Sequence, residues 1–106
     1  MNNPVQIPPY LGKIAEYALI NLEKNGFSPE NCRATSIRAS IAERQVVFTQ
    51  SVLAGNERHL LDCWGIFDLS RLLLEDPFRR FSKLKITVIF KGGKTKEINY
   101  RIYPEI

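Results

Sequence analysis

Histidine and cysteine are scarce in this chain of 106 residues, which contains one histidine and two cysteines. A histidine-based metal site would have to recruit carboxylates at ligand spacing, and no suitable pair is present. Cys32 and Cys63 are too few for a disulfide framework, and neither has a second Cys or His nearby at a zinc-ligand spacing. We therefore expect two reduced, partly buried thiols, and a disulfide between them is the alternative. We expect no metal and no cofactor.

Long apolar runs are also lacking. No stretch approaches the ~20 apolar residues that a membrane span requires. The first residues have neither the basic start nor the apolar middle of a signal peptide. We therefore expect no membrane association and a cytoplasmic protein. The apolar content of 44% suffices for an ordinary core, and the length predicts a single domain over residues 1–106.

Acidic residues become rare near the C-terminus. Residues 1–76 hold seven Lys or Arg against nine Asp or Glu, whereas residues 77–106 hold eight against two. This basic C-terminal third is a candidate surface for nucleic acid or for an acidic partner protein. Its members are Arg79, Arg80, Lys83, Lys85, Lys91, Lys94, Lys96 and Arg101.

The first half of the chain changes from a helical to an extended pattern. Apolar residues spaced three and four apart from Tyr10 to Leu22, after Pro8 and Pro9, predict an amphipathic helix that ends at Asn25-Gly26. Three β-rich segments follow, over 32–41, 45–53 and 58–67, and they predict an antiparallel meander. The alanines and isoleucines of 32–41 would also suit a helix, so that segment stays open.

Asp68 before a leucine-rich stretch predicts a second, capped helix that ends near Pro77. Two alternating segments on either side of Gly92-Gly93 then predict a β-hairpin. A two-residue turn would place Val88 opposite Glu97 and mix apolar with polar side chains on one face. We therefore predict a five-residue loop over 91–95, which sets Val88 opposite Ile98, Ile86 opposite Tyr100 and Leu84 opposite Ile102.

These elements predict an α+β fold of order α-β-β-β-α-β-β, with a largely antiparallel five-stranded sheet and the helices on one face. One cluster could carry nucleophilic chemistry, namely His59, Asp62 and Cys63. In a strand, however, Asp62 would point away from the other two, so an ordinary His beside a buried Cys is the favoured interpretation. Trp64 next to Gly65 is expected in the core, with a groove for a ligand or a partner as the alternative.

Three functions follow from these patterns. We expect no catalytic residues, and the favoured function is a non-enzymatic binding or regulatory protein that acts through protein contacts, alone or as a homodimer, through its terminal hairpin or a strand edge. The alternative is a nucleic-acid-binding protein that uses residues 77–106. A small enzyme or ligand carrier is the third.

Overall fold

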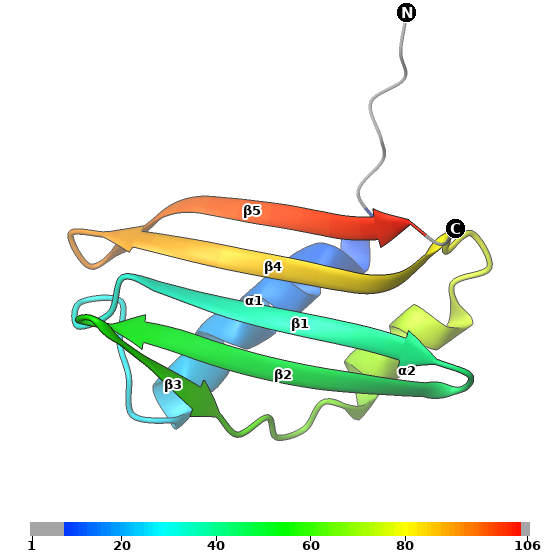
Figure 1. Ribbon diagram of the computed structural model, residues 1–106, viewed down its shortest axis with the longest axis horizontal. Coiled ribbons are helices and arrows are strands. Elements are labelled where there is room, and N and C mark those ends of the chain that lie inside the picture. The colour runs from blue at the N-terminus through cyan, green and yellow to red at the C-terminus, as the bar shows by residue number, and fades with distance from the viewer. Residues whose placement is uncertain (1–7, 105–106) are drawn as a thin grey trace, which may run out of the picture.

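The computed structural model describes residues 8–104, and within them two helices and five strands follow the predicted order. The helices are α1 (Pro9–Lys24) and α2 (Phe67–Glu75), and the strands are β1 (Ala34–Ala42), β2 (Gln45–Ala54), β3 (Glu57–Leu61), β4 (Phe81–Lys91) and β5 (Lys94–Pro104). All strand pairs are antiparallel, in the order β3-β2-β1-β4-β5. Figure 1 looks onto the open face of this sheet, with both helices behind it. The predicted fold class is confirmed.

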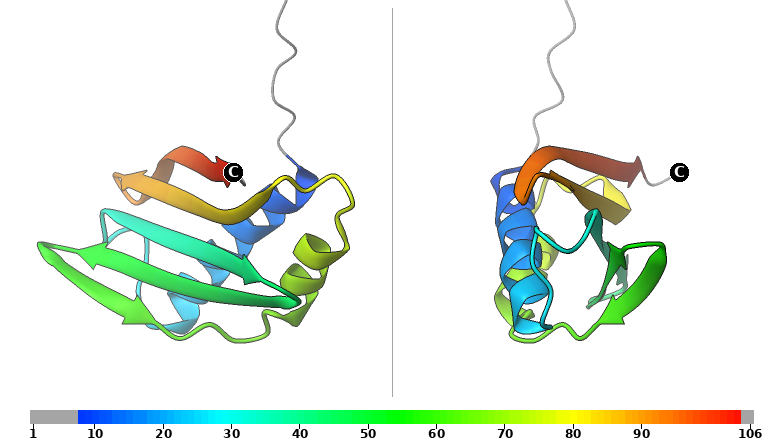
Figure 2. Two further views of the ribbon diagram at one scale, coloured as in Figure 1. Left: turned by 45° about the vertical axis from the view of Figure 1, so that its right-hand side comes forward. Right: turned by 90° about the vertical axis from the view of Figure 1, so that its left-hand side faces the viewer.

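The two helices cover one face of the sheet and leave the other uncovered (Figure 2). Leu11, Ile14 and Leu22 of α1 and Leu73 of α2 are fully buried there. The sheet contributes its inward residues to the same layer, and those of β1 and β4 are almost completely buried: Ile37, Ala39, Leu84, Ile86 and Val88. Residues 32–41, for which a helix was the alternative, are therefore mostly strand, because β1 is central in the sheet and alternates buried with accessible residues.

A polar network crosses the apolar layer near the end of α1. The amide of Asn21 donates to Gln50 Oε1 at 2.9 Å, and Gln50 Nε2 donates to the Ala18 carbonyl at 2.9 Å and to Thr35 Oγ1 at 3.0 Å. Because these groups are buried, the bonds tie α1 to β1 and β2 in one position.

The third strand is shorter than predicted, because β3 ends at Leu61 rather than at Phe67. The backbone of Asp62, the residue after β3, bonds to side chains at the end of α1 and not to a neighbouring strand. Asn21 Nδ2 donates to the Asp62 carbonyl at 2.7 Å, and the Asp62 N–H donates to Oδ1 of Asn25, the residue after α1, at 3.2 Å. Gly65 then adopts a left-handed φ of 65°. The strand prediction for 62–67 is therefore wrong.

The second helix starts and ends near the predicted positions, but its cap differs. It begins at Phe67, so Asp68 lies in the first turn, and the N-cap residue Ile66 makes no side-chain capping bond. It ends at Glu75, two residues before Pro77, as expected.

The hairpin has the predicted pairing but a different turn. Val88 lies opposite Ile98, Ile86 opposite Tyr100 and Leu84 opposite Ile102, as predicted. The five-residue loop is wrong, because Lys91 pairs with Lys94 across a two-residue Gly92-Gly93 turn with φ values of 63° and 78°. A register shift on the β5 side leaves Lys96 as an extra residue, so a β-bulge restores the match of apolar faces.

Candidate functional site

The open face of the sheet carries the candidate site. Side chains alternate along each strand, so every residue next to a buried one in β1, β2 and β4 points to this face. The paired registers place Arg38 of β1 beside Thr49 of β2 and Lys85 of β4, and Lys85 beside Arg101 of β5. One row across three neighbouring strands therefore carries three positive charges.

Two more cations flank this row. On one side of the row lies Lys83 of β4, which pairs with Ser40 of β1 and Tyr103 of β5. On the other side lies Arg58 of β3, which pairs with Leu53 of β2. We call the five residues Arg38, Arg58, Lys83, Lys85 and Arg101 the basic face. The strands also carry one carboxylate on the open face within residues 8–104. It belongs to Glu97, which pairs with Ile89 near the hairpin turn.

Next to the cationic row runs a row of neutral hydrogen-bonding groups. Ser36 lies between Ser51 of β2 and Thr87 of β4, and Thr87 lies opposite Asn99 of β5. The hydroxyls of Ser36 and Thr87 are 3.1 Å apart. Hydroxyl and amide groups placed beside guanidinium groups are suited to phosphate oxygens, which accept several hydrogen bonds.

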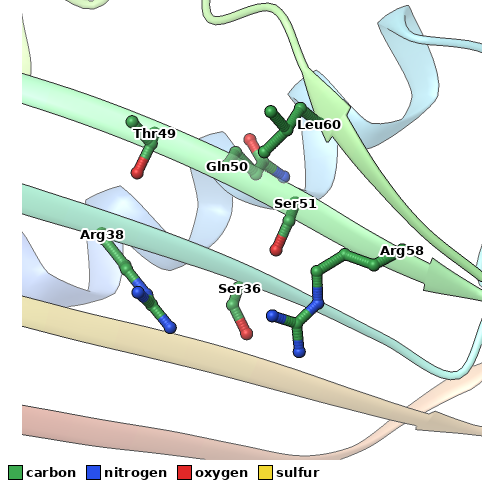
Figure 3. A pocket seen from close by; sticks show the side chains of 7 residues that line it. All are labelled: Ser36, Arg38, Thr49, Gln50, Ser51, Arg58 and Leu60. Atoms are coloured by element: carbon green, nitrogen blue, oxygen red, sulfur yellow. The ribbon is translucent and has the colours of Figure 1, made fainter.

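A shallow hollow of about 120 Å³ lies at the meeting point of these two rows. Figure 3 shows Arg38 and Arg58 on either side of Ser36, with Ser51 and Thr49 beside them. Leu60 borders the hollow and is 84% exposed, which leaves an apolar side chain at its rim. The hollow is therefore bounded by two guanidinium groups, three hydroxyls and one apolar surface.

The basic face is not neutralised within residues 8–104. Ion pairs of this part of the chain join Glu57 to His59 and Arg71 to Glu75, and no residue of the basic face takes part in either. Like charges that face each other directly across strands destabilise a sheet by a few tenths of a kcal/mol up to about 1 kcal/mol. The row of Arg38, Lys85 and Arg101 therefore costs stability, and a bound polyanion would relieve that cost.

An aromatic ring stands at the edge of the basic face. The Arg101 guanidinium lies over the Tyr103 ring, 5.2 Å from its centre, and Tyr103 is 38% exposed. Both groups are planar and can stack against a nucleobase. Phe90 and Tyr100 of this hairpin lie on the helix-covered side, as expected from their alternation, and Phe81 at the start of β4 is also buried.

The structure divides the predicted basic set into three places. Lys83, Lys85 and Arg101 lie on the basic face. The lysines at positions 91, 94 and 96 lie at the hairpin end, away from the central row. Arg79 and Arg80 lie between α2 and β4, where Arg79 donates to the carbonyls of Leu73 and Phe81 and so helps to hold the chain in place.

Sequence reasoning missed Arg38 and Arg58. Both precede the basic C-terminal third, and β1 and β3 reach the site only because β1 pairs with β4 and β2 with β3. The available signal was the alternation in 34–42, which sets Ser36, Arg38 and Ser40 on the face opposite Ile37 and Ala39.

The possible nucleophilic cluster is not assembled. His59 Nε2 lies 3.7 Å from a Glu57 carboxylate oxygen, and the centres of the His59 and Phe27 rings are 5.5 Å apart. Cys63 instead neighbours Tyr17. Burial raises the pKa of the Cys63 thiol, which disfavours the reactive thiolate. No hydrogen bond joins His59 to Cys63 among residues 8–104. Cys32 and Cys63 are both free thiols, as predicted.

Trp64 does not pack in the core, where it was expected, because it is 50% exposed. Its carbonyl accepts a 2.7 Å hydrogen bond from the Tyr17 hydroxyl, which holds this loop against α1.

Within the described part of the chain, no group of three or more His, Cys, Asp or Glu side chains is arranged to hold a metal ion. Neither helix there is long and apolar enough to cross a membrane. No family model, no curated protein and no solved structure is significantly similar to this chain.

Proposed function

We propose that this protein binds single-stranded nucleic acid on the open face of its sheet, as a binding protein and not as an enzyme. The observation that carries the proposal is the row of Arg38, Lys85 and Arg101 on adjacent strands, which has no carboxylate partner among residues 8–104. A phosphate backbone laid across these strands would meet the three cations in succession.

Two features favour a single strand over a duplex. Within residues 8–104 the face is a sheet surface from which no helix protrudes to enter a groove, so paired bases would stay out of its reach (Figure 2). A single strand exposes its bases, and Tyr103, the Arg101 guanidinium and Leu60 offer surfaces against which bases can pack.

The hollow between Arg38 and Arg58 is the place where we expect a phosphate to bind most closely. Two guanidinium groups can each donate to the same phosphate, and Ser36 and Ser51 add hydroxyl donors. Contacts of this kind carry little sequence information, so we expect weak discrimination between sequences. The proposal requires no cofactor, and it is consistent with a cytoplasmic location.

The test is a titration of labelled single-stranded and double-stranded oligonucleotides, followed by fluorescence anisotropy at low and moderate salt. We expect the wild type to bind the single strand more tightly, with an affinity that falls steeply with salt. The double variant Arg38→Glu/Lys85→Glu should lose at least about tenfold in affinity and should show a shallower salt dependence, by about 0.7 per lost phosphate contact.

The matched control is Lys13→Glu/Lys24→Glu, which makes the same change in net charge on α1, on the other side of the sheet. It should retain most of the affinity. If the control loses as much as the face variant, the effect is one of net charge only and the proposed site is wrong. Failure of the wild type to bind at low salt would remove nucleic acid altogether and leave an acidic partner protein as the function to pursue.

A further inference from the structure

Among the residues that the structure describes, no strand pairs with the outer edge of β5. The strand runs over 11 residues, whereas the opposite edge of the sheet is formed by β3, which has five. Short edge strands protect a sheet against pairing with another chain, and long ones invite it. Of the two edges, β5 is therefore the one suited to pair with a further strand.

The hydrogen-bond pattern shows which residues of β5 direct their backbone groups outward. The Phe90 N–H donates to the Arg33 carbonyl at 2.8 Å, so Phe90 points its backbone groups toward β1. By alternation Ile89, Thr87 and Lys85 bond to β5, through their partners Glu97, Asn99 and Arg101. The backbone groups of Ile98, Tyr100 and Ile102 therefore point to the free edge.

This edge is complementary to itself in one antiparallel register. With a twofold axis at Asn99, Ile98 lies opposite Tyr100 of the partner subunit, and both residues have outward backbone groups that can bond. The same register places Glu97 opposite Arg101 of the partner subunit, once on each side of the axis. An axis at Ile98 would instead set Glu97 opposite Asn99 of the partner subunit. An axis at Tyr100 would set Glu97 opposite Tyr103 of the partner subunit.

We propose that a second copy of this chain pairs with the first along β5 in this register. Antiparallel pairing about the axis joins the two sheets into one and keeps both basic faces on the same side. The apolar contact between Ile98, which is 36% exposed, and Tyr100 of the partner subunit lies on the helix side of the sheet.

The association should be weak. The Glu97–Arg101 pairs are accessible to solvent, so each contributes little to the affinity. The contact is a single pair of strands, so it lies at the small end of specific interfaces, and we expect a dissociation constant on the order of 10 µM. The charge pairs mainly fix the register, because they disfavour the neighbouring alignments.

Sedimentation equilibrium of the full chain without nucleic acid, over a range of concentrations, tests the proposal. We expect the mean mass to rise from 12.2 kDa toward twice that value as the concentration increases. Glu97→Arg and Arg101→Glu should each weaken the association at least about tenfold, because each sets like charges opposite one another. The double variant Glu97→Arg/Arg101→Glu should recover it.

Recovery in the double variant is the decisive result, because residues 97 and 101 of one strand are too far apart along it to pair with each other. Glu16→Arg, an equal charge change on an exposed position of α1, is the control and should associate as the wild type does. A wild-type mass of 12.2 kDa at every concentration overturns the proposal, and so does a folded double variant that stays as weak as the single variants.

A backbone variant checks the same edge without a change of charge. Ile98→Pro removes an N–H that faces the free edge and leaves the bonds to β4 in place, so the monomer should stay folded while the association is lost. Persistent association in a folded Ile98→Pro protein contradicts the pairing. These masses are measured without oligonucleotide, so they are independent of whether the basic face binds nucleic acid.

Discussion

The two faces of the sheet differ in what each side chain does. On the helix-covered face, Ile37, Ile86 and Val88 are at most 1% exposed, and their burial stabilises the fold. On the open face, the same strands present Arg38, Lys85 and Thr87, of which the first two repel each other. One layer therefore provides the stability of the domain, and the other is free to carry charge for binding.

The largest effect should follow from placing a charge on the covered face. Val88 is fully buried opposite Thr35 and Ile98, so Val88→Asp would bury an unpaired carboxylate. We expect a loss of about 4 kcal/mol or more in the free energy of unfolding, measured by urea denaturation. Thr49→Asp, on the open face opposite Arg38, should change it by less than about 0.5 kcal/mol. Similar losses in the two variants would show that the faces are not distinct.

Alkaline pH should lower the stability of the fold mainly through groups on the helix-covered face. Burial raises the pKa of Tyr17 to about 12 and also raises that of Cys63. The folded protein therefore keeps these protons at a pH where the unfolded chain releases them, so stability is full below about pH 9 and falls as the pH rises through 10 toward 12.

Tyr17→Phe removes one of these groups together with its hydrogen bond to Trp64. Its melting temperature should be lower at pH 7 by about 5 °C or less, since one such bond contributes about 1 kcal/mol at most. Between pH 9 and 11 the melting temperature of this variant should fall less steeply with pH than that of the wild type. An equally steep decline, followed by circular dichroism, would assign the alkaline loss to other groups.

The smallest effect has the opposite sign. Lys85→Glu sets a carboxylate between Arg38 and Arg101, so it should raise the free energy of unfolding by about 0.5 kcal/mol while weakening the binding of single-stranded oligonucleotides. Denaturation and anisotropy on the same preparation measure both. A variant that is less stable than the wild type would contradict our account of the cationic row.

The sequence alone determined the order of the elements and which hairpin residues face inward. Apolar spacing and alternation report the helix and strand periods directly, so α1, β2 and the pairing of Val88 with Ile98 could be predicted. Prediction from the sequence was wrong where a tertiary contact decides the local conformation. The side chains of Asn21 and Asn25 hydrogen-bond to the backbone of Asp62, so β3 ends early. A bulge at Lys96 allows a two-residue turn.

Only the tertiary structure decided where the candidate site lies. The local density of charge pointed to residues 77–106, yet Arg79 is bound to backbone carbonyls and the hairpin lysines lie at one end. Arg38 and Arg58 complete the basic face because β1 pairs with β4 and β2 with β3, pairings between segments far apart in the sequence. A local pattern assigns a side chain to a face of its own strand, but strand order determines which side chains become neighbours, and that order follows from how the whole chain buries its apolar surface.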